Sequence, residues 1–251
     1  MATVLSGTSG ALYYKPAGTK ATFAEAAVDV ANDELDLAAY LNFKVGDPVV
    51  FSVVNVNTGA AGSGTLPAGL TAGTTYYVIG YTASTGVMQV SATAGGATVA
   101  ITDDGTAVAP NAFQVAYADY AAVGQVQNWS FEVTRAEIDV TTIGQTAGQY
   151  APFRAYIPGF ADGSGSASVF VTNDDTTLAS RLVQDVLQQS QAGAAFKLYI
   201  DKLSSEALSR SIAMEATLLT ASFTVNPDDA QVVELTFRPT SAPTFDFSKS
   251  A

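Results

Sequence analysis

The chain has 251 residues, of which 48% are hydrophobic and only 14% are charged, and its formal net charge is −12. It contains no cysteine, which excludes a disulfide framework and a cysteine-ligated zinc site. It contains no histidine, which excludes serine–histidine and cysteine–histidine nucleophile pairs. The composition does not exclude an enzyme whose catalytic residues are all carboxylates.

Charge and hydropathy also limit the partners of the chain. Its 23 acidic and 11 basic residues disfavour tight binding to a nucleic-acid backbone, because such binding depends on Lys and Arg. No apolar run approaches the roughly 18 residues of a membrane helix, and the first residues lack the pattern of a signal peptide. We therefore expect a soluble protein, folded in a cytoplasm, with no membrane contact.

The first 122 residues predict short strands separated by turns. A strand is expected at residues 11–15, before a Pro-Ala-Gly turn. From residue 24 onward, strands recur about every dozen residues with Gly, Pro and Asp between them, which is typical of a small β-barrel or sandwich. These expected strands are residues 28–31, 35–37, 49–54, 75–79, 87–90 and 99–102.

Residues 128–173 contain two alternating runs, each with the period of a half-buried strand. The apolar faces are Trp129, Phe131 and Val133 in the first run and Ala167, Val169 and Val171 in the second. The Gly-, Thr- and Gln-rich span between the runs is too long for a tight hairpin. A loop of this length predicts contact with a partner.

One α-helix is expected at residues 177–191, where apolar side chains recur at helical spacing and Gly193 follows as a C-cap. Its polar face is assigned to solvent, with a subunit contact as the alternative. That face consists of Gln184, Asp185, Gln188 and Gln189. A further strand is expected at residues 194–200, and two or three more over residues 210–219, 221–225 and 232–237.

The carboxylates do not form a catalytic pattern. The adjacent acids at residues 103–104, 174–175 and 228–229 stand beside turn residues, and adjacent residues of a strand point to opposite faces. The small-residue run at residues 163–166 lacks the lysine and helix start of a phosphate loop. We expect no catalytic, cofactor-binding or metal-binding residue, and core packing for Trp129.

The order of segments from residue 129 onward resembles the tail tube proteins, or major tail proteins, of long-tailed (siphovirus-like) bacteriophages. The aromatic strand at residues 129–133 leads into Ile138-Asp-Val-Thr-Thr142, and Tyr156-Ile-Pro-Gly159, Gly163-Ser-Gly-Ser166, a strand and a helix follow. The resemblance covers the C-terminal half and, loosely, the first two dozen residues. Residues 24–122 instead resemble a module inserted in many phage structural proteins, through Val45-Gly-Asp-Pro-Val49 and Leu66-Pro-Ala-Gly-Leu-Thr71.

This resemblance implies a mainly β fold: a tail-tube β-barrel or sandwich with one flanking α-helix, plus an inserted small all-β domain. The tube domain is expected at residues 1–23 and 123–251, and the inserted domain at residues 24–122, on the tube exterior. It implies a structural virion protein, not an enzyme, that self-assembles as stacked homohexameric rings into a hollow tube for genome ejection. DNA passes through without specific binding. The other expected partners are the tape measure, terminator and baseplate or distal tail proteins of a virion made in the host cytoplasm.

The resemblance also assigns contact residues. The loop of residues 139–159 is expected to reach the next ring or subunit. Its candidate contacts are Asp139, Val140, Thr141, Thr142, Gln149, Tyr150, Arg154, Tyr156, Pro158 and Gly159. Glu132, Glu215 and Glu234 are candidate acids of the tube lumen, and the alternative for each is that it keeps an outer surface soluble.

Three other functions stay open. A virion-surface adhesin could bind glycans through the aromatic, Thr-rich middle region. A related tail ring protein, such as a terminator or baseplate protein, could share the fold. A carboxylate-only hydrolase would need two acids that converge in one cleft, and the sequence shows no sign of such a pair.

Overall fold

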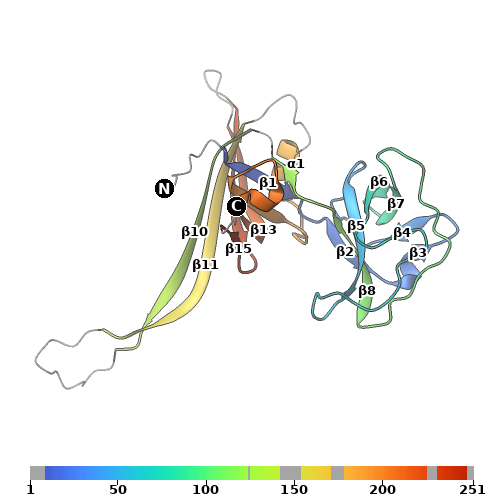
Figure 1. Ribbon diagram of the computed structural model, residues 1–251, viewed down its shortest axis with the longest axis horizontal. Helices are drawn as coiled ribbons and strands as arrows, with labels where there is room; N and C mark the ends of the chain where they lie inside the picture. The colour runs from blue at the N-terminus through green and yellow to red at the C-terminus, as the bar shows by residue number, and fades with distance from the viewer. Residues whose placement is uncertain (1–8, 124, 142–153, 171–177, 225–230, 248–251) are drawn as a thin grey trace, which may run out of the picture.

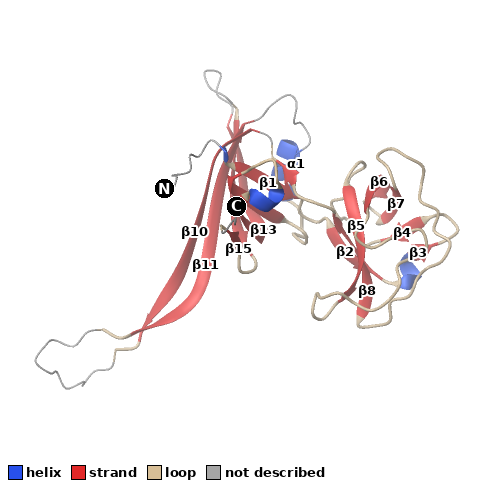
Figure 2. Ribbon diagram, viewed as in Figure 1, coloured by secondary structure: helices blue, strands red, loops and turns tan. Residues whose placement is uncertain are grey.

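The computed structural model describes residues 9–123, 125–141, 154–170, 178–224 and 231–247 (Figure 1). These residues form two antiparallel β-sheets and one α-helix, α1 (Leu178–Asp185), with two short 3-10 helices, η2 (Glu25–Ala27) and η3 (Glu206–Leu208). Strands are the main secondary structure of the described residues, as Figure 2 shows. The expectation of a mainly β fold with one α-helix is confirmed.

The larger sheet, with α1, forms the part that we call the body. Across the sheet the strands are β10 (Gln125–Asp139), β11 (Tyr156–Phe170), β14 (Val232–Pro239), β13 (Arg210–Thr224), β12 (Ala195–Asp201), β1 (Ala11–Lys15) and β9 (Ala121–Ala122), with β15 (Thr244–Asp246) paired to β13. Side chains from β1, β12, β13, β14 and α1 meet in one hydrophobic core. Alternation along β14 buries Leu235 and Phe237 there and exposes Glu234 and Thr236.

The smaller sheet forms the part that we call the lobe. Its strands, in order, are β2 (Lys20–Phe23), β8 (Asn111–Tyr117), β5 (Pro48–Asn55), β6 (Thr75–Thr82), β7 (Val87–Ser91), β4 (Glu34–Asp36) and β3 (Val28–Asp29). Its own core gathers aromatic side chains, with the rings of Phe23 and Phe113 5.4 Å apart and those of Phe51 and Tyr76 5.7 Å apart. The lobe therefore has the interior that an all-β module needs.

Strand pairing changes from the body to the lobe between Lys15 and Lys20, and back again between Tyr117 and Ala121. The expected domain division, at residues 23/24 and 122/123, differs from these points by a few residues. It stays a prediction, because hydrogen-bonded sheets do not by themselves define units that fold alone.

Several strands differ from the sequence-based expectation. For residues 210–219, 221–225 and 232–237 two or three strands were expected, and the structure has two, because β13 continues from Arg210 to Thr224 with a register shift between Leu218 and Thr220; residue 225 lies outside the described residues. Residues 99–102 lie outside every strand and are flanked by single bridges at Thr98 and Asp103. The two runs of residues 128–173 extend toward each other and pair as one long hairpin, from Gln125 and Phe170 to Asp139 and Tyr156.

The helix ends earlier than expected, at Asp185, and the lobe covers part of its polar face. After Asp185 the backbone tightens, because Leu187 and Gln188 donate to the carbonyl groups three residues earlier, at 3.0 and 3.1 Å. The solvent assignment is wrong for Asp185, which is fully buried. Gln184 and Gln188 hydrogen-bond to residues of the lobe, and the side chains of Gln184 and Gln189 are exposed, so the face is partly a contact within the chain and partly open to solvent.

Candidate assembly surfaces

The most prominent surface feature is an arm that projects from the body (Figure 1). It is the outer part of the β10–β11 hairpin, residues 133–141 and 154–163. Each strand has 15 residues, which corresponds to roughly 50 Å of extended chain. Trp129 and Phe131 pack against the body core, whereas Val133, expected on the same buried face, is 52% exposed because the arm has passed the edge of the core by that point.

Large apolar side chains are exposed along the arm. Phe160 is 92% exposed, and Ile138 and Ile157, directly opposite each other on β10 and β11, are each 48% exposed. Val140 and Tyr156 are exposed beside them. Exposed apolar groups gathered on one projecting element are typical of a protein–protein contact.

Several of the predicted contact residues meet where the arm ends. Asp139 accepts a hydrogen bond from the backbone N–H of Thr141 at 2.9 Å, and the Thr141 side chain accepts one from Ala155 N–H at 2.9 Å. Hydrogen bonding from Thr141 lowers the pKa of Asp139. Arg154 Nη1 lies 3.8 Å from Asp139 Oδ2, in an exposed ion pair.

The other predicted contacts fall into two groups. Tyr156, Pro158 and Gly159 lie in β11 rather than in a loop, and Val140 adjoins the end of β10. Thr142, Gln149 and Tyr150 lie outside the described residues.

A second surface is the outer face of β10, β11, β14 and the C-terminal half of β13, which we call the hydroxyl face. Ser130 and Ser166 face each other across β10 and β11 with their Oγ atoms 2.8 Å apart. Thr236 and Thr220 do the same across β14 and β13 at 2.6 Å. The opposite side of these strands carries the apolar core.

The hydroxyl face depends on the irregularity in β13. Before it, Met214, Ala216 and Leu218 point into the core, and after it Thr220 and Ser222 are exposed. The extra residue, Leu219, shifts the alternation by one position, which keeps polar side chains outward as the strand changes partner from β12 to β14.

Two of the three candidate lumen acids share the hydroxyl face. Glu132 pairs with Ser164, and Glu234 lies between Ser168 and Ser222, so strand register places both on it. Both are exposed. Glu215 lies elsewhere: it faces the lobe, with Oε1 3.7 Å from Lys20 Nζ.

The four strands of the hydroxyl face end in two open edges. Within the described ranges, β10 pairs only with β11, and the Leu218–Thr224 half of β13 pairs only with β14. An unpaired edge strand offers its backbone N–H and C=O groups to a strand of another molecule.

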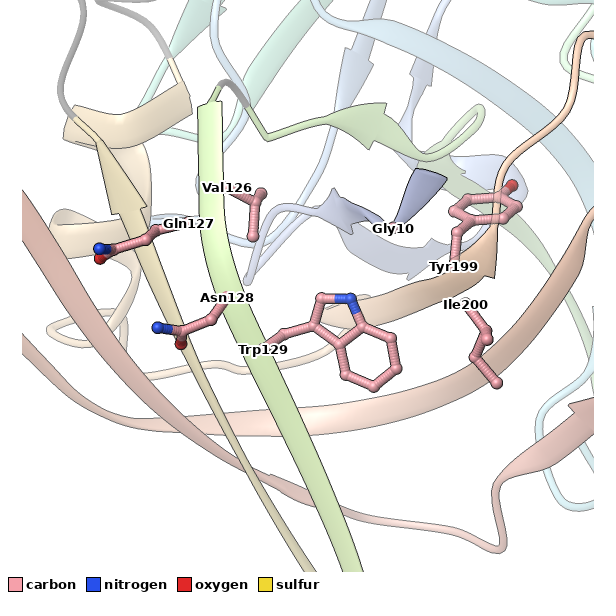
Figure 3. Close-up of a pocket in the computed structure, with 7 residues that line it drawn as sticks. All are labelled: Gly10, Val126, Gln127, Asn128, Trp129, Tyr199 and Ile200. Atoms are coloured by element: carbon pink, nitrogen blue, oxygen red, sulfur yellow. The ribbon is translucent and has the colours of Figure 1, made fainter. Parts of the chain in front are cut away.

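A cavity of about 340 Å³ lies beside the open edge of β10 (Figure 3). The Trp129 ring points from β10 toward Tyr199 and Ile200, whereas the amide groups of Gln127 and Asn128 point away from it. A sugar site needs polar groups that converge on the aromatic platform. This arrangement fits the expected packing role of Trp129 and does not favour glycan binding here.

The solved structures described below resemble this chain weakly. No family model and no curated protein matches the chain. Among solved structures, the virion of a native gene transfer agent particle aligns at 14% identity and a TM-score of 0.39, over 50% of this chain and 88% of that one. The tail of an empty gene transfer agent particle aligns at 13% and 0.38, over 50% and 85%, and the SPP1 tail tube at 11% and 0.37, over 53% and 70%.

TM-scores below 0.5 do not establish a shared fold, so the function of this chain has to be argued from its own residues. Among the described residues, no helix is long and apolar enough to cross a membrane. In the same part of the chain, no three carboxylates gather as ligands for a metal ion.

Sequence reasoning missed the hydroxyl face, although the sequence contains a signal for it. Ser164, Ser166 and Ser168 alternate with small residues at the period of a strand. What the alternation could not indicate is that Ser130, Thr236 and Thr220 continue the same face on three other strands.

Proposed function

We propose that this chain is a structural subunit of a phage-like tail tube, in which copies join as rings and the rings stack. The observation that carries the proposal is the four-stranded section of the body sheet. It combines a polar outer face, an apolar inner face and two open edges.

Ring formation follows from the open edges. If β10 of one copy pairs with the free half of β13 of the next copy, both open edges of every copy are paired, one with each of its two neighbours. Such a head-to-tail contact closes into a ring when its rotation closes, and a closed ring leaves no sheet edge exposed. The sequence resemblance supports a hexamer.

The hydroxyl face then lines the channel. Its serine and threonine hydroxyl groups are neutral, and its acids Glu132 and Glu234 repel phosphate. Arg238 is a cation on β14, the strand of Glu234. It lies 3.8 Å from Asp162, whose negative charge offsets its positive charge. DNA can pass such a wall without specific binding.

Stacking follows from the arm. Its exposed apolar side chains, with Phe160 foremost, would be covered when the arm packs against the next ring. The location in a virion tail and the contacts with tape measure, terminator and baseplate proteins belong to this proposal and come from the sequence resemblance.

The ring can be tested by disulfide cross-linking, because the chain has no cysteine of its own. Within one copy, β10 and β13 are separated by β11 and β14, roughly 14 Å at the usual strand spacing, which is beyond the reach of a disulfide. A variant with both Ser130→Cys and Thr220→Cys should give, on oxidation, a ladder of covalent species that ends at the hexamer. Each single variant should stop at the dimer.

Electron microscopy of the concentrated protein is the companion measurement. Hollow tubes are expected. Single rings that never stack would point instead to a terminator-like or baseplate-like ring protein. A strict monomer with no cross-linked ladder at any concentration would contradict the proposal.

A further inference from the structure

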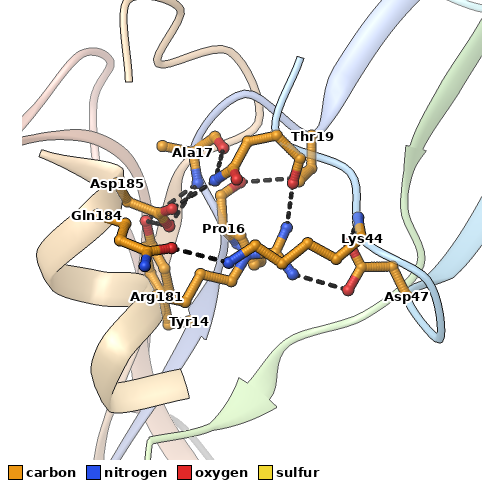
Figure 4. A network of polar contacts seen from close by, with 10 residues as sticks. Tyr14, Pro16, Ala17, Thr19, Lys44, Asp47, Arg181, Gln184 and Asp185 are labelled. Atoms are coloured by element: carbon orange, nitrogen blue, oxygen red, sulfur yellow. Dashed lines mark hydrogen bonds and ion pairs between the residues drawn. The ribbon is translucent and has the colours of Figure 1, made fainter. Parts of the chain in front are cut away.

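The lobe and the body meet at a junction of polar contacts, buried at its centre and exposed at its margin, between residues 181–188 and residues 40–47 of the lobe (Figure 4). From this junction we infer that α1 holds the lobe in one fixed orientation, so that the lobe is a rigid extension of the body rather than a module on flexible connections. The inference concerns a single copy and does not depend on the proposed function.

An ion pair at the centre of the junction joins the two parts. Arg181, on α1, donates from Nη1 to Oδ1 of Asp47, on the lobe, at 2.7 Å. Their side chains are only 5% and 9% exposed. Nη2 of the same guanidinium donates to the backbone carbonyl of Asn42. Asp47 is itself fixed, because its Oδ2 accepts from Lys44 N–H at 2.9 Å.

One turn further along α1, Asp185 binds the segment that leads from the body into the lobe. Its Oδ2 accepts from the Tyr14 hydroxyl at 2.7 Å and from Ala17 N–H at 3.1 Å. Its Oδ1 accepts from the side-chain amide of Asn42, which belongs to the lobe. A single carboxylate thus joins β1, the connection and the lobe.

Two glutamines, one on α1 and one in the turn after it, add further contacts with the lobe. Gln184 Oε1 accepts from Lys44 Nζ at 2.9 Å, and Gln188 Nε2 donates to the Tyr40 carbonyl at 2.7 Å. Gln184 shares one face of α1 with Arg181 and Asp185, at positions i+3, i and i+4, and Gln188 follows in the turn after the helix. Every one of these contacts is directional, so together they specify an angle between the parts as well as holding them together.

Buried charges explain why this junction resists opening. Separation of the parts removes Asp47 and the Asn42 carbonyl from Arg181 and the Asn42 amide from Asp185, whereas Tyr14 stays with Asp185 on the body. Removal of one partner from a buried ion pair is strongly unfavourable. Flexible connections between domains usually have few such contacts. The backbone connections are short as well: Tyr117 N–H donates to the Thr19 carbonyl at 3.0 Å, which ties the two crossing segments together.

Distance measurements between paired spin labels test the inference in the full-length protein, which has no native cysteine. Ser84→Cys on the lobe with Ser204→Cys on the body reports the angle between the parts. Thr58→Cys with Ser84→Cys, and Ser204→Cys with Ser241→Cys, report each part alone. All four labelled positions are exposed. In the native protein, the distribution of distances between the lobe label and the body label should be as narrow as the distributions measured within each part.

Arg181→Met should then broaden the distribution between the parts, or split it, while both internal distributions stay narrow. The matched control is Glu215→Gln, which removes the exposed ion pair to Lys20 at the same junction and should change nothing. A broad distribution between the parts in the native protein would overturn the inference without any variant. A distribution that stays narrow in Arg181→Met would assign the rigidity to other contacts and overturn the role of the ion pair.

Discussion

Gly165 is an example of a residue whose identity is dictated by its neighbour. A Cβ atom at this position would lie 2.3 Å from the Phe237 ring. That ring cannot easily retreat, because it is stacked on Phe196 with centroids 4.3 Å apart and both side chains are fully buried. The absence of a side chain on β11 therefore makes room for an aromatic pair in the body core.

Gly165→Ala is expected to lower the free energy of unfolding by about 1–3 kcal/mol, the usual effect of overpacking a core. Gly163→Ala is the matched control on the same strand, where the nearest atom to the added Cβ is Cγ of Pro239 at 3.1 Å. Urea denaturation of both variants measures the difference. Equal stability of the two would show that the core adapts more freely than this packing implies.

Glu206 is the acceptor of a small cationic cluster on the body. Lys197 and Lys202 donate to its two carboxylate oxygens, and the Tyr199 hydroxyl donates to Oε1 at 2.7 Å. Burial acts to raise the pKa of Glu206, but these three hydrogen bonds outweigh it and lower the pKa to about 2. A depressed carboxyl pKa contributes stability above the unfolded pKa and loses it as the pH falls through the folded value.

Glu206→Gln should therefore be less stable than the native protein at pH 7, and the difference should shrink as the pH falls from about 4.5 to about 2. Because the Glu206 side chain is 53% exposed, solvent screens the cluster and we expect an effect on the order of 1 kcal/mol or less. Thermal unfolding as a function of pH measures it. A difference that stays constant down to pH 2 would show that the charge of Glu206 is not responsible.

At the scale of elements, the arm combines apolar side chains with charges. Arg135, Glu137 and Asp139 are exposed beside Ile138 and Ile157. Charged residues along an exposed edge discourage unspecific strand pairing. The arm can therefore remain in solution while keeping an apolar surface for one partner.

Phe160→Ser is expected to leave the stability of the monomer within about 0.5 kcal/mol of the native value, because the side chain is 92% exposed. It should reduce or abolish assembly into tubes. Val108→Ser is the control, because Val108 is 76% exposed but lies on the lobe. Light scattering during assembly compares the extent of tube formation by the Phe160→Ser and Val108→Ser variants. Tubes that form as readily with Phe160→Ser as with the control would remove Phe160 from the proposed contact.

At the scale of the whole molecule, each part has its own core, and the chain crosses between them only twice. The two crossings are adjacent, because Tyr117 N–H donates to the Thr19 carbonyl. Removal of residues 20–116, with a two-glycine link from Thr19 to Tyr117, should leave a body that unfolds cooperatively. Circular dichroism during heating measures this, and a body with no cooperative transition would show that its core depends on the lobe.

The same truncated body tests where the lobe sits in an assembly. It should still form tubes, thinner in electron micrographs than those of the full chain, because the sequence resemblance and the proposed ring place the lobe outside. Tubes of unchanged outer diameter would contradict that position.

The sequence by itself determined the fold class, most strand positions and the single helix, because these depend on local alternation and on the spacing of apolar residues. It also indicated the packing role of Trp129 and the alternating serines of β11. These features depend on residues that are close in sequence, and the tertiary contacts are consistent with them.

Only the tertiary structure decided which strands are neighbours. The pairing of β10 with β11 across a 16-residue connection, residues 140–155, and the separation of Glu215 from Glu132 and Glu234, both depend on long-range register. The lobe contacts of α1 depend on residues 40–47, far away in sequence. A polar helix face has the same pattern whether it meets water or a buried ion pair, because local periodicity reports which side is polar and not what covers it.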